Sequence, residues 1–136
     1  KRIGTRAGDL TASNYRYIMI AGKKHKEHRL AFLYHYGCFP VDDLVVDHID
    51  ADRSNNTFWN LRLCTPEQNK RNVGRSCRNT SGYKGVSYSK PTGKWKAKIQ
   101  CDGVDHYLGL YETPEQAHKA YVKLGKELHG EFFNAG

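Results

Sequence analysis

Hydrophobic and polar residues alternate strictly over residues 94–101, whose sequence is KWKAKIQC. Successive side chains of a strand point to opposite faces, so this pattern predicts a strand with one apolar face and one lysine-bearing face. The Asp102-Gly103 pair that follows favours a tight hairpin turn into a second antiparallel strand. The apolar face has to be covered, and the next segment predicts the element that covers it.

A helix is predicted from Thr113 onward, where the sequence reads TPEQ. Thr is a good N-cap residue, Pro suits the first helical position, and Gln completes a capping box. Gly130 is expected to end this helix. Its apolar positions recur every three or four residues, as on a buried helical face: Ala117, Ala120, Tyr121, Leu124 and Leu128. We therefore expect a three-stranded antiparallel sheet with one helix on its apolar face and an open lysine face.

The first half of the chain predicts shorter elements. Residues 14–28 alternate around a turn at Ala21-Gly22, which indicates a hairpin. The segment HRLAFLYHYG then predicts a short helix that ends at Gly37.

Two further short strands are predicted at residues 44–49 (LVVDHI) and 60–65 (NLRLCT). They enclose a polar loop, and a second TPEQ helix start follows at Thr65. Small antiparallel sheets and separate helices together predict the α+β class.

The composition of the chain indicates a polyanionic binding partner. Of the 136 residues, 38% are hydrophobic and 12% aromatic, which is typical of folded material and leaves room for one ordinary domain or two very small ones. The formal net charge is +8. A protein this basic usually binds nucleic acid or an anionic membrane surface.

Membrane and secreted settings are disfavoured by the sequence. No apolar run approaches the roughly 20 residues that cross a bilayer, no signal-peptide pattern opens the chain, and the basic residues do not follow one face of a single helix. The cysteines contain no C-x-x-C pair, so we expect reduced, mostly buried thiols and a cytoplasmic protein: Cys38, Cys64, Cys77 and Cys101. The chain begins at Lys1 rather than Met, which leaves the length of the natural N-terminus open.

Basic residues concentrate in the middle of the chain. Between Glu67 and Asp102 no acidic residue occurs, whereas nine basic ones do: Lys70, Arg71, Arg75, Arg78, Lys84, Lys90, Lys94, Lys96 and Lys98. A merely solvated surface mixes both signs, so this run favours a strip that faces phosphates. The small, polar composition near its centre is typical of a linker. We predict a first domain over residues 1–75, a linker over 76–82 and a second domain over 83–136.

The polar loop between the two short strands allows three interpretations. A calcium-binding EF-hand loop starting at Asp50 is excluded, because Asn55 and Leu61 occupy the positions that need Gly and Glu. An ordinary turn accounts for the many Asp, Asn and Ser residues. A metal-assisted phosphodiesterase site accounts for the whole combination of residues, described next.

Four polar residues fall at matching places in the predicted elements. Asp47-His48 lies on the first strand, Asn60 opens the second, and Asn69 lies in the following helix. With the flanking sequences HRL, DHID, NLR and EQNKRN, residues 10–72 resemble the ββα-metal core of HNH nucleases. The last family position, often His, is Asn69 here, a variant found in phage and intron-encoded proteins.

The resemblance implies a role for each of these residues. His48 takes a proton from water, and Asp47 and Asn69 offer oxygen ligands to one divalent ion, Mg²⁺ or Mn²⁺ rather than tightly bound Zn²⁺. Asn60 fixes the loop and the orientation of His48. Adjacent strand residues point to opposite sides, so the resemblance also implies a bend that brings Asp47 and His48 together. His28 is left open between packing and a DNA contact.

Several basic residues lie close to this candidate site in sequence, where they could hold the scissile strand: Arg62, Lys70, Arg71 and Arg75. The second half contains the matching sequences YKGV, GKW, LG-Y and HGE, and is similar to the Apetala-two/ethylene-response-factor DNA-binding domain. That resemblance implies that the sheet enters the major groove. The positions that this resemblance places toward the groove are Lys84, Ser87, Ser89, Lys98 and Gln100. Asp105 replaces a basic residue of those relatives, which puts a third-strand contact in doubt.

The combined prediction is a DNA endonuclease resembling free-standing homing endonucleases of phage or intron origin. We expect double-stranded DNA as its partner, one divalent metal ion, and no small-molecule cofactor. A monomer would nick DNA and a homodimer could cut both strands, and the sequence does not choose between them. A non-catalytic DNA-binding regulator and an RNA-binding protein are the alternatives.

Overall fold

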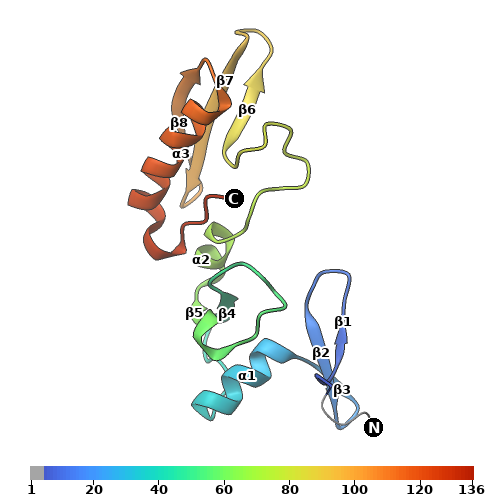
Figure 1. Ribbon diagram of the computed structural model, residues 1–136. Helices are drawn as coiled ribbons and strands as arrows, with labels where there is room; N and C mark the ends of the chain where they lie inside the picture. Colours follow the sequence, from blue (N-terminus) through green and yellow to red (C-terminus); the bar gives the residue numbers. More distant parts are fainter. Residues whose placement is uncertain (1–4) are drawn as a thin grey trace. The chain divides into compact units, whose positions relative to one another are not determined.

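The computed structural model describes residues 5–136 (Figure 1). It divides the chain into two compact units, Lys1–Pro66 and Glu67–Gly136. Each unit combines helices with a small antiparallel sheet, so the α+β class is confirmed. None of the helices within residues 5–136 combines the length and hydropathy needed to cross a membrane.

The first unit opens with a three-stranded antiparallel sheet in the order β1-β2-β3. Its strands are β1 (Asp9–Leu10), β2 (Arg16–Ile20) and β3 (Lys23–Lys26). Ala21 and Gly22, with φ of 47° and 76°, form the turn between β2 and β3. Two consecutive positive φ angles suit a tight hairpin, which confirms the turn predicted there. The two-residue strand β1 was not predicted.

Helix α1 (Glu27–Tyr36) follows β3 directly. It ends as predicted at Gly37, whose φ of 73° is left-handed and whose N–H donates to Leu33 O at 2.8 Å. A residue without a side chain accepts this conformation readily, so Gly37 stops the helix.

The rest of the first unit is an antiparallel pair, β4 (Val45–His48) and β5 (Leu61–Cys64), joined by a polar loop and the short 3-10 helix η1 (Phe58–Asn60). Both predicted strands are therefore confirmed. The apolar core is small: Phe32 of α1 packs against Val46 and Leu61. Polar groups must contribute to holding such a unit together, because little apolar surface is available.

The short helix α2 (Pro66–Arg71) starts at the last residue of the first unit, and its remaining residues open the second unit. A three-stranded antiparallel sheet follows, formed by β6 (Val86–Ser89), β7 (Lys94–Cys101) and β8 (Val104–Tyr111). Helix α3 (Pro114–His129) covers one face of this sheet (Figure 1), and η2 (Gly130–Phe132) ends the ordered elements. This is the sheet-and-helix arrangement predicted from the alternation.

The strand alternation of β7 is confirmed by burial. Ala97 and Ile99 are 0% and 3% exposed, whereas Lys96, Lys98 and Gln100 between and beside them are exposed. Ala97 packs against Val86 and the helix residue Ala117. A bulge between Ala97 and Lys98 shifts the register with β8 without reversing the two faces.

The predicted start of α3 is also confirmed. Thr113 Oγ1 accepts a hydrogen bond from Gln116 N at 3.3 Å, and Pro114 begins the helix. Gly130 follows its last residue as predicted. The buried positions are Ala117, Tyr121, Gly125 and His129, so His129 rather than Leu128 is buried in the last turn.

Two expectations about residue environments need correction. The cysteines are free thiols, as predicted, but only Cys64 is buried, whereas Cys38 and Cys77 are exposed. Residues 76–82, predicted as a linker, contain no helix or strand but are hydrogen-bonded: the single Ser81 Oγ–H has Val86 O and Tyr83 O as acceptors, both at 2.9 Å. The predicted domain limits at 75 and 83 remain predictions.

Candidate functional site

Asp47 and His48 lie at the end of β4 and are both buried, with 6% and 3% of their surface exposed. Asp47 is paired across the strands with Arg62, and His48 with Leu61. Neighbouring strand residues face opposite sides, so these two side chains have different partners. The convergence implied by the resemblance therefore remains a prediction.

Asp47 makes an ion pair with Arg62 inside the first unit. Asp47 Oδ2 accepts from Arg62 Nε at 3.1 Å and lies 3.0 Å from Arg62 Nη2. The side chains are only 7% and 13% exposed, so little water screens the pair. Arg62, predicted to hold DNA, is engaged with the predicted metal ligand in this structure.

His48 is surrounded by rings on one side and an amide on the other. Its Nε2 lies 2.6 Å from Asn56 Oδ1. The His28 ring packs edge-on at 5.0 Å between centroids, and the Tyr15 ring lies at 6.2 Å. The imidazole is therefore oriented by direct contacts from the loop, from α1 and from the segment before β2.

Asn60 closes the loop that follows His48. Its Nδ2 donates to Asp50 Oδ1 and to Asn55 O, both at 2.8 Å, and its Oδ1 accepts from Asp50 N at 3.1 Å. Burial raises the pKa of Asp50, but the hydrogen bonds from Asn55 and Asn60 outweigh this and hold it below its ordinary value. Asn60 thus connects both ends of the loop, and its role in orienting His48 remains a prediction.

His28 is the second histidine of this region and is 5% exposed. Burial, with the nearby His48 and Lys26, lowers its pKa to about 3, so it is neutral at physiological pH. Its Nδ1 has no hydrogen-bond partner among the described residues. The packing interpretation of His28 is therefore favoured by its contacts, because it lies against His48 rather than at the surface.

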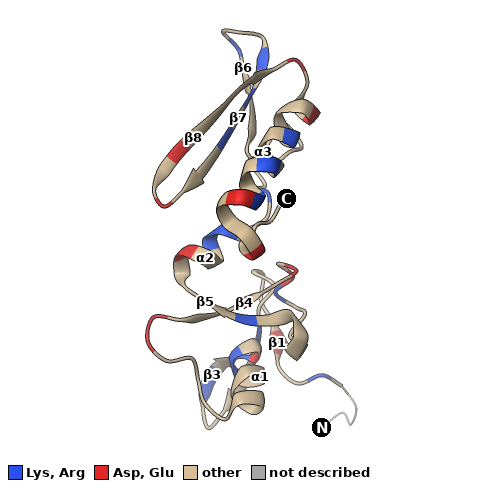
Figure 2. Cartoon of the chain, turned by 90° about the vertical axis from the view of Figure 1, so that its left-hand side faces the viewer, with Lys and Arg blue, Asp and Glu red and all other residues tan. Residues whose placement is uncertain are grey.

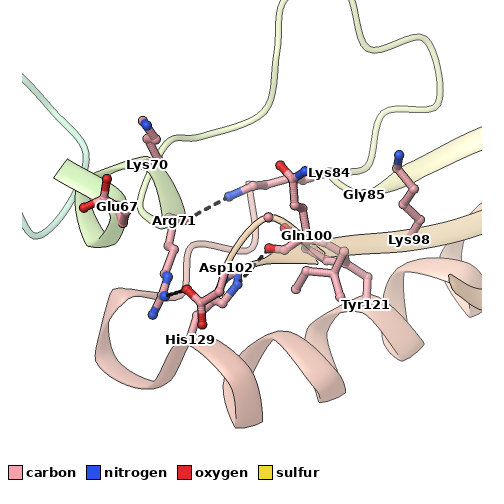
Figure 3. Close-up of a pocket in the computed structure, with 12 residues that line it drawn as sticks. Glu67, Lys70, Arg71, Lys84, Gly85, Lys98, Gln100, Asp102, Tyr121 and His129 are labelled. Carbon is pink, nitrogen blue, oxygen red and sulfur yellow. Dashed lines mark hydrogen bonds and ion pairs between the residues drawn. The ribbon is translucent and has the colours of Figure 1, made fainter. Parts of the chain in front are cut away.

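Asn69 lies on α2, in the second unit, and is half-buried. The C-terminal end of this helix is held by residues from the sheet and the chain end. Lys84 Nζ donates to Arg71 O at 3.3 Å and to Asn134 O at 2.8 Å, and Asn134 Nδ2 donates to Asn72 O at 3.0 Å. Arg71 also pairs with Asp102 (Figure 3).

Lys84 departs from its predicted role as a groove-facing contact. Its ammonium also donates to Val73 O at 2.5 Å, which makes three carbonyl partners in all. An ammonium group has three protons, so these bonds use its donors fully. Burial lowers the pKa of Lys84, and its side chain lines a pocket of about 460 Å³ together with Lys70, Lys98 and Gln100 (Figure 3). In this structure Lys84 therefore holds the end of α2, and its contact with DNA remains a prediction.

The other candidate DNA-contact residues differ in the interactions that they make within the protein. Lys98 pairs with Asp105 at 2.7 Å, and Lys94 with Glu112 at 2.6 Å, both as exposed pairs. Arg75 donates to Gly82 O. Exposed positions of the second unit include the remaining predicted contacts: Lys70, Arg78, Ser87, Lys90, Lys96 and Gln100. Ser89 is half-buried. Basic positions recur along β7 (Figure 2), where the exposed Lys96 and Lys98 alternate with the buried Ala97 and Ile99.

Comparison with known proteins agrees with the geometry of the first unit. Residues 25–71, which contain α1, β4, the loop, β5 and α2, match the family model described as HNH endonuclease. Protein 3.8 of Escherichia phage T7 is 36% identical over 87 residues, which make up 64% of this chain and 71% of the phage protein. Residues 25–71 therefore belong to an HNH endonuclease domain.

Two further relatives come from a virus and a plant. An uncharacterized HNH endonuclease of Acanthamoeba polyphaga mimivirus is 40% identical over 90 residues, covering 66% of this chain and 46% of the viral protein. An ethylene-responsive transcription factor of Arabidopsis thaliana is 32% identical over 95 residues, covering 66% of this chain and 57% of the plant protein. The chain thus spans about half the length of these two relatives. No solved structure matches it.

These findings confirm the HNH prediction and the likeness to a plant ethylene-response factor. The homing type and the fusion of the two modules remain predictions. Within residues 5–136, no three His, Cys, Asp or Glu side chains gather into a metal-binding group.

Two residues of the candidate site were missed by sequence reasoning. Asn56 contacts His48, and Glu27 accepts from Asn56 Nδ2 at 2.5 Å. Glu27 looked like an ordinary acidic residue at a helix start, and Asn56 like one of several loop asparagines. A pairing between residues 29 positions apart leaves no local pattern that could have revealed it.

Proposed function

We propose that this protein is a metal-dependent endonuclease that hydrolyses phosphodiester bonds in double-stranded DNA. The observation that carries the proposal is the buried Asp47-His48 pair beside a loop closed by Asn60, inside the segment that matches the HNH endonuclease family. A buried, oriented histidine next to a carboxylate is suited to proton transfer and cation binding at one phosphate.

In the proposed reaction His48 accepts a proton from a water molecule. The water oxygen forms a bond to phosphorus, the bond from phosphorus to the departing sugar oxygen breaks, and that oxygen takes up a proton from solvent. Asn60 keeps the loop beside His48 closed through its bonds to Asp50 and Asn55. The protein thus supplies an oriented base at the attacked phosphate.

Asp47 is a proposed ligand of one divalent ion, with Mg²⁺ favoured and Mn²⁺ also suited to oxygen donors, and Asn69 is the second ligand that the family resemblance implies. The bound ion would supply positive charge that stabilises the leaving oxygen. Arg62 already neutralises the Asp47 carboxylate, so the ion would share or replace this partner. Hard oxygen ligands with incomplete protein coordination fit an ion that retains water.

The second unit is proposed to hold DNA through the open face of its sheet. Lys96 and Lys98 project from β7 on the face opposite α3, and Ser87 pairs with Lys96 across the strands. Lysine ammonium groups attract phosphates without reading bases sharply, so this face would mainly position the duplex. Tethering it to the nuclease unit raises the effective concentration of the site at its target.

A non-catalytic DNA-binding regulator is the second candidate. The observation that favours it is the Asp47–Arg62 pair, because a carboxylate engaged with a guanidinium is a poorer metal ligand. Such a protein would bind DNA through the same sheet but leave it intact.

Incubation of the purified chain with supercoiled plasmid tests the proposal. We expect nicked or linear DNA with Mg²⁺ or Mn²⁺ and none with EDTA, and the ratio of nicked to linear product reports whether one or both strands are cut. Gel-shift assays on the same samples give the binding control. Binding without cleavage in every divalent ion would contradict the proposal and support the regulator.

A further inference from the structure

A continuous hydrogen-bonded chain leads from His48 to the first residue of α1. His48 Nε2 lies 2.6 Å from Asn56 Oδ1, and Asn56 Nδ2 donates to Glu27 Oε2 at 2.5 Å. His48 is 3% exposed and the Glu27 side chain 16%. These bonds are short and largely shielded from water, which strengthens them.

The far end of the chain is fixed by arginines. Arg6 Nε and Nη2 donate to the two Glu27 carboxylate oxygens at 2.9 and 2.5 Å, and Arg16 Nε lies 3.9 Å from Oε2. Arg6 Nη2 also donates to Ser54 O at 3.0 Å, two residues before Asn56. Burial raises the pKa of Glu27, but hydrogen bonds from Arg6 and Asn56 together hold it below its ordinary value.

The chemistry of these groups determines the direction of each hydrogen bond. An ionised carboxylate can only accept, so Asn56 must direct its NH₂ group toward Glu27 and its carbonyl oxygen toward His48. An amide oxygen also only accepts, so Nε2 of His48 must carry the proton. A neutral imidazole has one N–H, and its lone pair therefore stays on Nδ1.

We propose that Asn56 and Glu27 are positioning residues that hold neutral His48 in its Nε2-protonated tautomer and leave Nδ1 as the proton-accepting atom. Neither residue touches the reacting atoms. The use of Nδ1 in hydrolysis rests on the proposed function, whereas the tautomer is a property of the metal-free protein alone. Fixing the tautomer matters because an imidazole whose lone pair lies on the other nitrogen cannot accept the proton that the base has to remove from water.

Nitrogen-15 NMR of the metal-free, DNA-free protein tests the tautomer directly. At a pH where His48 is neutral, we expect a protonated Nε2 and an unprotonated Nδ1, assigned by the loss of these signals in His48→Gln. A proton on Nδ1, or an even mixture of tautomers, in the wild-type protein would overturn the proposal. This readout needs no catalysis, so it is unaffected if the proposed nuclease function fails.

Asn56→Ala and Asn55→Ala form a matched pair of variants. Both asparagines are half-buried in the same loop, but the Asn55 side chain bonds Asp50 and Thr57 and not His48. We expect Asn56→Ala to mix the two tautomers and lower kcat by roughly tenfold to a hundredfold with little change in KM, and Asn55→Ala to keep the wild-type tautomer. A single Nε2-protonated tautomer in Asn56→Ala would refute the role of Asn56.

Glu27→Gln gives a second, milder variant that retains the shape of the side chain. Its amide can still accept from Asn56 but can also donate, so the direction of the chain is no longer enforced. We expect a smaller shift of the tautomer balance and a kcat between those of wild type and Asn56→Ala. An unchanged balance in Glu27→Gln would remove Glu27 from the proposal.

Discussion

Polar groups lie inside the first unit, around His48, whereas in the second unit two lysines lie on the open face of a sheet. Buried polar residues of the first unit include Asp47, His48 and Asn60, beside an apolar core of a few side chains. In the second unit Ala97 and Ile99 face the helix while Lys96 and Lys98 face outward.

The two units therefore combine stability and function in different ways. The hydrogen bonds that orient His48 also hold the loop of the first unit, so a single substitution there should change both stability and activity. In the second unit the two faces of β7 divide these tasks, so stability and DNA binding should respond to different substitutions. The predictions below test this contrast.

The largest effect is expected from removing the cation inside the first unit. Arg62→Met leaves the Asp47 carboxylate, 7% exposed, without its guanidinium and should cost roughly 3–5 kcal/mol of unfolding free energy. If the proposed ion binds Asp47, Mg²⁺ should restore more stability to this variant than to wild type. Urea unfolding with and without Mg²⁺ measures both quantities.

Lys98→Met is the matched control for Arg62→Met. It removes the cation of a pair whose side chains are 52% and 51% exposed, so the expected cost is below about 1 kcal/mol. Equal destabilisation by the two substitutions would break the contrast between the units. An identical Mg²⁺ effect on wild type and Arg62→Met would argue against Asp47 as the metal ligand.

Next in size is the loss of a loop-closing asparagine. Asn60→Ala removes the bonds to Asp50 and Asn55 and should destabilise the protein by about 2–4 kcal/mol. It should also slow DNA cleavage, because the loop beside His48 is released. Thermal unfolding and plasmid cleavage, below the unfolding temperature of the variant, report the two effects.

Asn79→Ala provides the comparison in the second unit. The Asn79 side chain also makes several loop bonds, donating to Tyr83 O at 2.8 Å and accepting from Gly82 N at 2.9 Å. We expect lower stability, by about 1–2 kcal/mol, with no change in the cleavage rate of bound DNA. A cleavage defect as large as that of Asn60→Ala would contradict the division of tasks.

A pH effect of intermediate size is expected from His28. The folded state keeps His28 neutral down to about pH 3, whereas an unfolded histidine binds a proton near pH 6.5. Between these values the unfolded state binds more protons, so stability falls as pH is lowered, by up to roughly 1.4 kcal/mol per pH unit. Urea unfolding across this range should show a shallower slope for His28→Leu. Parallel curves would show that His28 does not titrate in this way.

The smallest change in stability is expected on the open sheet face. Lys96→Gln should alter unfolding free energy by less than about 0.5 kcal/mol, weaken DNA binding, and reduce the salt dependence of log Kd by about one unit of slope. The adjacent Ala97→Leu overfills the interface with α3 and should cost about 1–3 kcal/mol. DNA affinities measured at several salt concentrations distinguish Lys96→Gln, which weakens DNA binding, from Ala97→Leu, which lowers stability. A salt slope unchanged in Lys96→Gln would remove Lys96 from the DNA contacts.

Much of the fold was predictable because its signals are local. The alternation of Lys96, Ala97 and Lys98 and the capping sequence at Thr113 each act within a few residues, and the structure follows them. Strand β1 escaped prediction because two residues carry no periodicity. Cys38 and Cys77 were expected to be buried from residue type alone, which does not report local packing.

The candidate site was predictable only where a family pattern marked it. Asp47, His48 and Asn60 were identified through their spacing, whereas Glu27 and Asn56 depend on a contact between distant segments. Lys84 looked like a surface lysine, since nothing local reveals that its ammonium donates to carbonyls far along the chain, including that of Asn134.

Cleavage of supercoiled plasmid by His48→Ala and wild type, under single-turnover conditions with saturating protein and Mg²⁺, tests the central claim most directly. The account predicts that wild type cuts and that His48→Ala is slower by roughly a hundredfold or more, while both bind the plasmid equally. Cleavage by His48→Ala at the wild-type rate would contradict His48 as the base of the reaction.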